Sequence, residues 1–158
     1  MAENLIIEGS TKEEKYANLF PQIKSVLSAE RDMIANMANV CSMLHETFNF
    51  FWTGFYRVID GELVLSPFQG PLACTRIKKG RGVCGTAWQE EKTLIVPDVD
   101  KFDGHIACSS LSKSEIVVPV FRNKEIFAVL DIDSKELNTF DDTDKQWLEK
   151  IVALFDIE

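Results

Sequence analysis

The sequence has few histidines, no closely spaced cysteine pair and no long apolar run. Two histidines among 158 residues leave few candidates for a general base or a zinc ligand. The four cysteines include no Cys-x-x-Cys pair, the spacing typical of structural zinc sites. No stretch approaches the ~18 consecutive apolar residues that span a bilayer. A zinc-stabilised module is therefore disfavoured, and we expect no association with a membrane.

Positive charge is also scarce. Lysine and arginine number 17 against 25 aspartates and glutamates, which gives a formal net charge of −8. A protein of this charge repels phosphate backbones, and its one basic cluster, residues 76–81, is short. We therefore expect no nucleic-acid partner.

The N-terminus lacks the basic segment, apolar stretch and small-residue cleavage site of a secretory signal peptide. A cytoplasmic protein is expected, in which cysteines stay reduced at rest. The question is then which thiols belong to the core and which are redox-active or metal-binding. The four are Cys41, Cys74, Cys84 and Cys108.

Apolar residues recur with a helical period near both ends of the chain. Residues 12–26 follow this period, and Pro21 indicates a kink or a restart of the helix at that point. Ser28 is typical of the N-cap of a second helix, whose apolar stripe includes Cys41. A final amphipathic helix is expected after Asp141.

Two hairpin patterns lie between these helices. Aromatic and β-branched residues flank Asp60 and Gly61, a strong signal for a two-residue turn. A second pair of strands surrounds residues 122–124, where Pro119 indicates an edge strand or a bulge. A short helix holding Cys84 is expected between the hairpins.

The length fits one domain with one substantial core. We therefore expect residues 1–158 to form a single α+β domain. Its central antiparallel sheet should carry the N- and C-terminal helices packed against it.

The first strand of the first hairpin is rich in aromatic residues. By the two-residue period of a strand, Phe50, Trp52, Gly54, Tyr56 and Val58 share one face. The glycine removes a side chain between two rings, which predicts a notch in the sheet surface. The alternative is that both rings simply fill the core.

The last strand places two carboxylates on one face that begins apolar, those of Asp131 and Asp133. Glu115 joins them only in the right register. A three-residue loop at 122–124 places Glu115 opposite Asp131, whereas a two-residue loop turns it to the other face. Either the acids line a pocket for a small zwitterion or amine together with the aromatic rings, or they leave the strand end for solvent.

The segment 104–115 is polar, with four serines close after Cys108, and this composition indicates a partly exposed thiol. Redox chemistry and metal binding are both open uses for such a cysteine. A Cys-His-acid hydrolase is not supported, because the one candidate base, His105, is a chain neighbour of the thiol and no motif accompanies it.

Four segments resemble one enzyme family. They are GPLACTRIKKGRGVCGTAW, IVPDVDKFDGHIACSS, SEIVVPVF and LDIDS. These segments are similar to the free methionine-(R)-sulfoxide reductases, which are single GAF-domain enzymes, and the resemblance covers nearly the whole chain. It implies a GAF-like fold and the reduction of free methionine-(R)-sulfoxide to methionine by thiol chemistry. A GAF sensor that binds a small metabolite without catalysis is the alternative.

The resemblance also implies roles for individual residues. Cys108 corresponds to the nucleophile, Cys74 to the resolving thiol and Cys84 to an auxiliary thiol. The implied substrate pocket comprises Trp52, Tyr56, Glu115, Asp131 and Asp133. No bound cofactor or metal is implied; thioredoxin is the implied reductant, with NADPH acting indirectly, and family members are often homodimers. Ser109 departs from the family, in which aspartate commonly follows the nucleophile.

Overall fold

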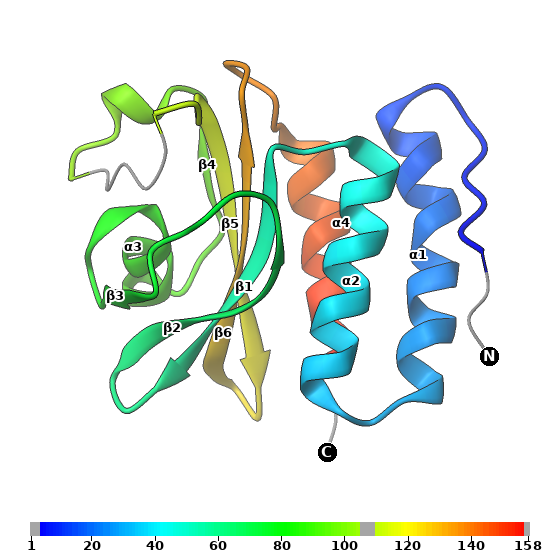
Figure 1. Cartoon of the computed structure of the whole chain (residues 1–158), viewed down its shortest axis with the longest axis horizontal. Helices are drawn as coiled ribbons and strands as arrows, with labels where there is room; N and C mark the ends of the chain where they lie inside the picture. The colour runs from blue at the N-terminus through cyan, green and yellow to red at the C-terminus, as the bar shows by residue number, and fades with distance from the viewer. Residues whose placement is uncertain (1–3, 105–109, 157–158) are drawn as a thin grey trace.

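The computed structural model describes residues 4–104 and 110–156, which form a mixed α+β architecture. Its six strands form one antiparallel sheet in the order β3-β2-β1-β6-β5-β4. Helices α1, α2 and α4 cover one face of this sheet, and α3 lies on the other (Figure 1). The helices are α1 (Lys12–Ala29), α2 (Met33–Phe48), α3 (Gly82–Glu90), α4 (Asp142–Ala153) and the 3-10 turn η1 (Val99–Lys101). The strands are β1 (Trp52–Ile59), β2 (Glu62–Gln69), β3 (Arg76–Lys78), β4 (Leu94–Val96), β5 (Ser114–Arg122) and β6 (Glu125–Ser134).

The N-terminal helices differ from the sequence prediction in two details. Helix α1 does not restart at Pro21 but continues to Ala29, because side chains on both sides of the proline are buried against the rest of the fold. Ser28 is not an N-cap; its hydroxyl donates to the carbonyl oxygen of Ser25 at 2.8 Å. Asp32 caps α2 instead, accepting from a backbone N–H three residues later. None of the described helices has both the length and the apolar composition needed to cross a membrane.

Both predicted hairpins are present, each with a two-residue turn. Asp60 and Gly61 adopt φ of 50° and 80°, and Asn123 and Lys124 adopt 52° and 67°. Two consecutive residues with positive φ give the turn whose twist matches paired antiparallel strands. The hint from Pro119 is also confirmed, because β4 pairs with β5 only at residues 115–117 and a bulge follows the proline.

This bulge decides which face of the sheet receives Glu115. Val120 pairs with Ala128 while Phe121 pairs with Ile126, so β6 contains one extra residue at this point. An extra residue shifts all later pairs by one position and reverses the face they occupy. Glu115 therefore lies opposite Asp133. The expectation that a two-residue loop turns Glu115 away was wrong because it assumed an unbroken ladder.

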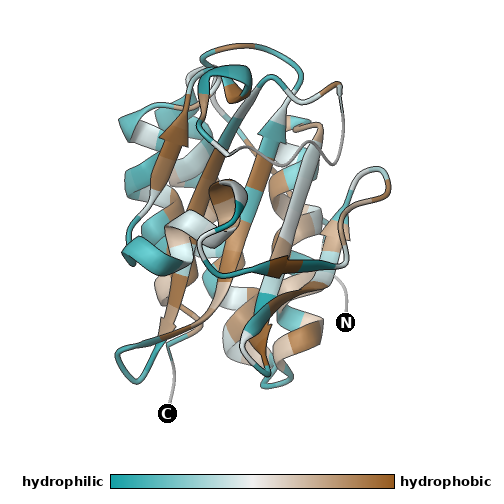
Figure 2. Ribbon diagram, turned by 90° about the vertical axis from the view of Figure 1, so that its left-hand side faces the viewer, coloured by the Kyte–Doolittle hydropathy of each residue, from teal (hydrophilic) through white to brown (hydrophobic). Residues whose placement is uncertain are grey.

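The sheet separates two apolar clusters. The larger fills the space between the sheet and helices α1, α2 and α4, and includes Phe50, Phe55 and Leu148. The smaller lies under α3 and includes Trp52 and Tyr56. Figure 2 looks onto this second side, where brown apolar segments run along the strands behind α3. Phe50 was predicted to share a face with the pocket aromatics, but it precedes β1 and packs in the larger cluster instead.

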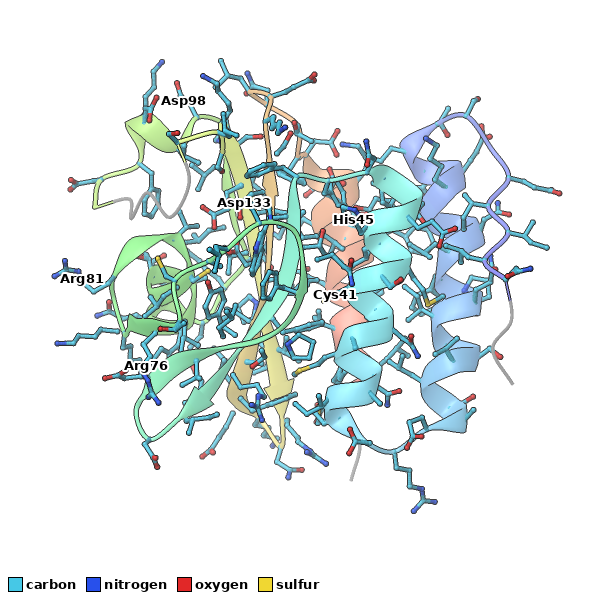
Figure 3. The ribbon with its side chains drawn as sticks, in the orientation of Figure 1. Cys41, His45, Arg76, Arg81, Asp98 and Asp133 are labelled. Carbon is cyan, nitrogen blue, oxygen red and sulfur yellow. The ribbon has the colours of Figure 1, made fainter. Side chains whose placement is uncertain are left out.

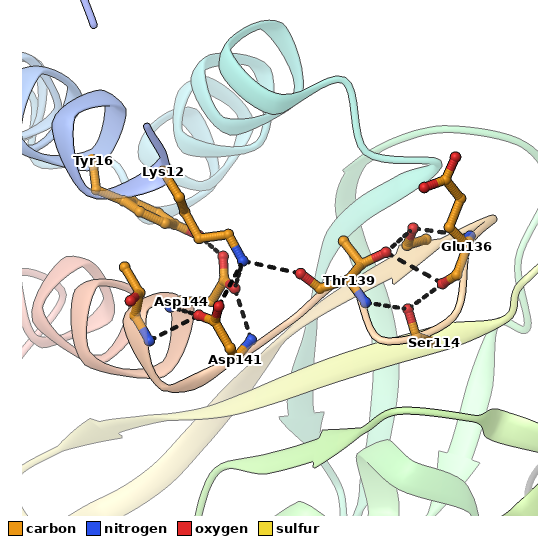
Figure 4. Close-up of polar contacts among 9 residues, drawn as sticks. Lys12, Tyr16, Ser114, Glu136, Thr139, Asp141 and Asp144 are labelled. Carbon is orange, nitrogen blue, oxygen red and sulfur yellow. Dashed lines mark hydrogen bonds and ion pairs between the residues drawn. The ribbon is translucent and has the colours of Figure 1, made fainter. Parts of the chain in front are cut away.

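A buried ionic cluster joins the start of α1 to the start of α4 (Figure 4). The carboxylate of Asp144 is 1% exposed and accepts from the hydroxyl of Tyr16 and from Nζ of Lys12, both at 2.6 Å. Lys12 also donates to the carbonyl oxygen of Thr139 at 3.0 Å. Asp144 completes a capping box with Asp141. One carboxylate thus fixes the position of α1 relative to α4.

Replacing Asp144 by asparagine is expected to lower the free energy of unfolding by about 3 kcal/mol. The amide cannot supply the negative charge that pairs with the half-buried Lys12 ammonium, nor accept hydrogen bonds with both of its terminal atoms. Urea denaturation measures the change. Asp142→Asn is the matched control, because Asp142 is exposed on the same turn and should cost about 0.5 kcal/mol or less. Equal losses in the two variants would contradict the assigned role of the cluster.

Candidate active site

A pocket lies between the α3 side of the sheet and the loop that follows β2. Its free volume is about 60 Å³, room for about two water molecules. Its lining gathers residues from β1, α3, β5 and β6. The lining includes six predicted site residues, Trp52, Tyr56, Cys84, Glu115, Asp131 and Asp133. Segments up to 81 residues apart in the chain therefore meet at one place, since the first of these is residue 52 and the last residue 133.

Strand register aligns these side chains in rows across the sheet. Trp52 pairs with Asp133, and Asp133 pairs with Glu115 on its other side. In the next row, Gly54 pairs with Asp131. Because directly paired residues project from the same face, the indole and the three carboxylates all point toward α3. Figure 3 labels Asp133 on this side of the sheet, with Cys41 and His45 on α2.

The predicted notch at Gly54 is filled by the ring of Trp52 itself. A Cβ atom at Gly54 would lie 2.5 Å from Cβ of Phe68 and closer still to the indole. The indole stacks on Phe68 with ring centroids 5.2 Å apart and on Tyr56 at 5.9 Å. The glycine therefore allows an aromatic layer to lie flat against β1. This layer forms an apolar wall of the pocket. Trp52 and Tyr56 therefore belong to the smaller apolar cluster and also line the pocket.

Glu115 and Asp131 are buried and Asp133 is half-buried beside them, so the expectation that these acids leave the strand for solvent was wrong. Glu115 and Asp131 are each 6% exposed. Burial, followed by the charges of Asp131 and Asp133, raises the pKa of Glu115 well above its ordinary value. Burial and then the charge of Asp131 likewise raise the pKa of Asp133, although a hydrogen bond from Ser112 at 2.9 Å opposes that shift. A cation entering the pocket would relieve this crowding.

Cys84 faces the same acids from the first turn of α3. It is a free and buried thiol. Burial, and after it the charges of Asp131 and Glu115, raise the pKa of the Cys84 thiol well above its ordinary value. The neutral thiol is therefore the stable form beside the acids, and a neutral thiol is a weak nucleophile.

The comparisons with known proteins agree with this geometry. The sequence matches the GAF-domain family over residues 30–157. GAF domain-containing protein A of Dictyostelium discoideum is 63% identical over 157 residues, which is 99% of each chain. The free methionine-R-sulfoxide reductase of Escherichia coli is 45% identical over 143 residues, covering 90% of this chain and 87% of the relative. The X-ray structure of the Neisseria meningitidis free methionine-R-sulfoxide reductase in complex with its substrate is 50% identical. It superimposes with a TM-score of 0.95 over 97% of this chain and 93% of that chain. The chain belongs to the free methionine-R-sulfoxide reductase family of GAF domains.

The other described cysteines of the chain occupy different surroundings from Cys84. Cys74 lies in the loop between β2 and β3 and is disulfide-bonded. Cys41 is buried on α2, donates to the carbonyl oxygen of Pro67 and has its pKa raised by burial to about 12. The core role predicted for Cys41 is therefore confirmed. The predicted nucleophile Cys108 and its neighbour Ser109 lie outside the described residues.

Sequence reasoning missed two parts of the pocket. Ser112 was counted only as a polar neighbour of Cys108, yet it donates to Asp133. The first turn of α3, residues 82–84, lines the pocket with no side-chain cap on its backbone N–H groups. Arg81 precedes this turn and also lines the pocket, although its side chain is exposed and extends away from the sheet (Figure 3). The Gly-rich sequence GRGVCG was the available signal for such an uncapped helix start.

One group of side chains in the described part of the chain has metal-ligating geometry. Ligand atoms of Cys84, Glu115 and Asp131 lie within 4.8 Å of one another. The sequence left metal binding open for Cys108, which is not one of these three residues. These three residues belong to the pocket already described, and their crowded charge suits an ammonium group as well as a metal ion.

Proposed function

We propose that this protein reduces free methionine-(R)-sulfoxide to methionine. The observation that carries the proposal is the convergence of an aromatic wall, a buried thiol and three carboxylates on one pocket. The acids sit on the neighbouring strands β5 and β6, beside the aromatic residues of β1. Membership of the family and the substrate complex of the Neisseria relative support the same reaction.

The pocket offers a partner for each part of the substrate. The crowded carboxylates of Glu115, Asp131 and Asp133 suit its ammonium group, because a cation lowers the free energy of holding three acids together. The uncapped first turn of α3 suits its carboxylate, since backbone N–H groups and the helix dipole favour an anion there. Trp52 and Tyr56 suit its methyl end.

This arrangement gives selectivity for the free amino acid. A methionine sulfoxide inside a peptide has no ammonium group, so it would leave buried acids without their cation. The same reasoning disfavours an N-acetylated substrate.

The thiol steps are proposed as follows. The thiolate of Cys108 attacks the sulfoxide sulfur, the oxygen is transferred to the thiol with protonation, and methionine leaves while Cys108 becomes a sulfenic acid. The proton that Cys108 loses on forming the thiolate returns to the transferred oxygen, so the step is balanced. Cys74 then condenses with the sulfenic acid to a disulfide and releases water. Thioredoxin supplies the two electrons that restore both thiols, and NADPH supplies them to thioredoxin. Cys84 is an auxiliary thiol.

Three wider features belong to the same proposal. Residues 1–158 form one GAF-like domain, in keeping with the family match over residues 30–157. The protein works in the cytoplasm, where a thioredoxin system keeps thiols reduced. We also propose that it forms a homodimer, the assembly that the family resemblance implies.

The deciding experiment follows NADPH consumption with thioredoxin and thioredoxin reductase present. Free L-methionine-(R)-sulfoxide should be turned over, whereas the (S) epimer and N-acetylmethionine-(R)-sulfoxide should react at least about tenfold more slowly. Mass spectrometry after one equivalent of substrate should find a Cys74–Cys108 disulfide.

Cys108→Ser is the control for the chemistry. If the wild-type protein consumes no NADPH, or if Cys108→Ser consumes it equally fast, the proposed reductase activity is contradicted. Tight binding of the sulfoxide without turnover would favour the sensor alternative instead. A Cys84–Cys108 disulfide would overturn the assignment of Cys74 as the resolving thiol.

A further inference from the structure

The two pocket aromatics also hold the loop that carries Cys74. The indole Nε1–H of Trp52 donates to the carbonyl oxygen of Pro71 at 3.1 Å. The hydroxyl of Tyr56 donates to the carbonyl oxygen of Cys74 itself at 2.9 Å. Two neighbouring side chains of one strand face thus bind both ends of the segment 71–74.

Between its two ends the segment also has some packing, because Ala73 and Cys74 contact the smaller apolar cluster. Leu72, midway between the tethers, is 91% exposed, so its side chain adds almost no packing. Before the segment, Gly70 adopts φ of +140°, and a Cβ atom there would lie 2.6 Å from Cδ1 of Trp52. After it, the carbonyl oxygen of Thr75 accepts from the N–H of Leu65 at 2.9 Å. The hydroxyl of Tyr56 therefore holds the backbone of Cys74 by a hydrogen bond, in addition to the packing of the segment and the disulfide of Cys74.

We propose that Tyr56 is a positioning residue for the second thiol step. Its hydroxyl holds the backbone of Cys74 where the thiol can form its disulfide, in addition to the contact of its ring with substrate. Cys74 is disulfide-bonded in this structure with the tether in place. The hydrogen bond from Tyr56 and the disulfide of Cys74 both stabilise the same position of the loop, so each makes formation of the other more favourable. The inference rests on the proposed function.

The step concerned is the condensation of Cys74 with the sulfenic acid of Cys108. The sulfur of Cys74 attacks the sulfur of Cys108, an S–S bond forms and the S–O bond breaks. The oxygen leaves as water with its own proton and the proton of the Cys74 thiol. A loop that samples other positions brings the two sulfur atoms together less often, which slows this step. Tyr56 is 2% exposed, and burial, then the charge of Asp131, raises the pKa of Tyr56, so the hydroxyl remains a donor throughout.

Tyr56→Phe tests the inference in a single turnover. The variant keeps the ring and removes only the hydroxyl. Rapid quenching with mass spectrometry gives the rates of methionine release and of disulfide formation, and dimedone traps the sulfenic acid between them. We expect the ratio of the second rate to the first to fall about fivefold, with a matching rise in the dimedone adduct.

Tyr16→Phe is the matched control, because it also deletes a buried tyrosine hydroxyl, one bonded to Asp144. It should lower stability and leave the ratio of rates unchanged. A wild-type ratio in Tyr56→Phe overturns the inference, and so does an equal fall in both variants. Absence of methionine release from the wild-type protein is a different result, which overturns the proposed function.

A second measurement needs no substrate. The wild-type protein and both variants are equilibrated in a glutathione redox buffer, and alkylation with mass spectrometry gives the reduced and oxidised fractions of Cys74. Tyr56→Phe should raise the ratio of reduced to oxidised Cys74 about fivefold. An unchanged ratio contradicts the inference even if the sulfoxide is not a substrate.

Discussion

Replacing Asp131 by asparagine is expected to lower kcat/KM for free methionine-(R)-sulfoxide about 100-fold. Asp131 is 6% exposed and contributes to the pKa shifts of Glu115, Asp133 and Cys84. Asp131 thus interacts with each of these other ionisable groups of the cluster. Truncating one member of a buried charge pair costs about 3 kcal/mol, which corresponds to this loss. Steady-state assays over a range of substrate concentrations measure it.

The loss should be confined to substrates with an ammonium group. N-acetylmethionine-(R)-sulfoxide, already a poor substrate, should lose much less, so the preference for the free amino acid collapses. The fold should remain intact, because removing one of three crowded carboxylates relieves repulsion, and the urea midpoint is expected at or above that of wild type. In Asp131→Asn, kcat/KM should therefore fall while the stability of the fold stays the same or rises.

Glu125→Gln is the control for charge alone. Glu125 is exposed at the opposite end of the same strand, β6. It should change kcat/KM by less than about twofold. Equal losses on the free and the acetylated substrate in Asp131→Asn would show that the acid does not recognise the ammonium group.

The sequence predicted the elements of this fold better than their register. The turn at Gly61 and the strands beside it could be predicted, because turn residues and the alternation of side chains are local properties of the sequence. The face of Glu115 was not, since it depends on one extra residue inside β6, near Phe127, that no local pattern marks. The length of the turn between β5 and β6 allowed two pairings for Glu115. The bulge produced a third, in which Glu115 lies opposite Asp133.

The strand pattern indicated the aromatic residues and the acids of the pocket, and the family resemblance added the roles of the thiols. The contacts among these residues needed the structure. Nothing local places Cys84 beside Asp131, because the contact depends on how α3 docks on the sheet. The pattern around Gly54 indicated a missing side chain but not that the indole of Trp52 lies over it. Likewise, the tether between Tyr56 and Cys74 joins residues of different elements, and only the folded backbone reveals it.

Substrate binding is expected to release protons, and its affinity should rise with pH. The pKa of Glu115 and that of Asp133 are raised in the free protein, so these carboxyls hold protons above the ordinary value of about 4. The substrate's ammonium group favours their ionised forms, which lowers both pKa values on binding. Protons therefore leave at every pH between the bound and the free pKa values. Affinity should rise up to about tenfold per pH unit for each proton released, until the substrate's own amine deprotonates.

Stability should follow the opposite trend. Between the unfolded value of about 4 and the raised native value, the folded protein binds more protons than the unfolded chain. The contribution of these acids to the free energy of unfolding is thus greatest at low pH and falls as pH rises through that window. Substrate should offset this loss, so its stabilising effect is larger at the upper end.

Titration calorimetry on Cys108→Ser tests the proton release without turnover. The apparent binding enthalpy in two buffers of different ionisation enthalpy gives the number of protons released. The double variant Glu115→Gln, Asp133→Asn in the same background should release almost none and should lose the pH dependence of affinity. Identical enthalpies in both buffers for the Cys108→Ser protein would mean that the acids are already ionised before substrate arrives. The cluster would then be a permanently negative site. Selectivity for a free ammonium group would come from charge attraction alone, and not from the lowering of carboxyl pKa values that burial had raised.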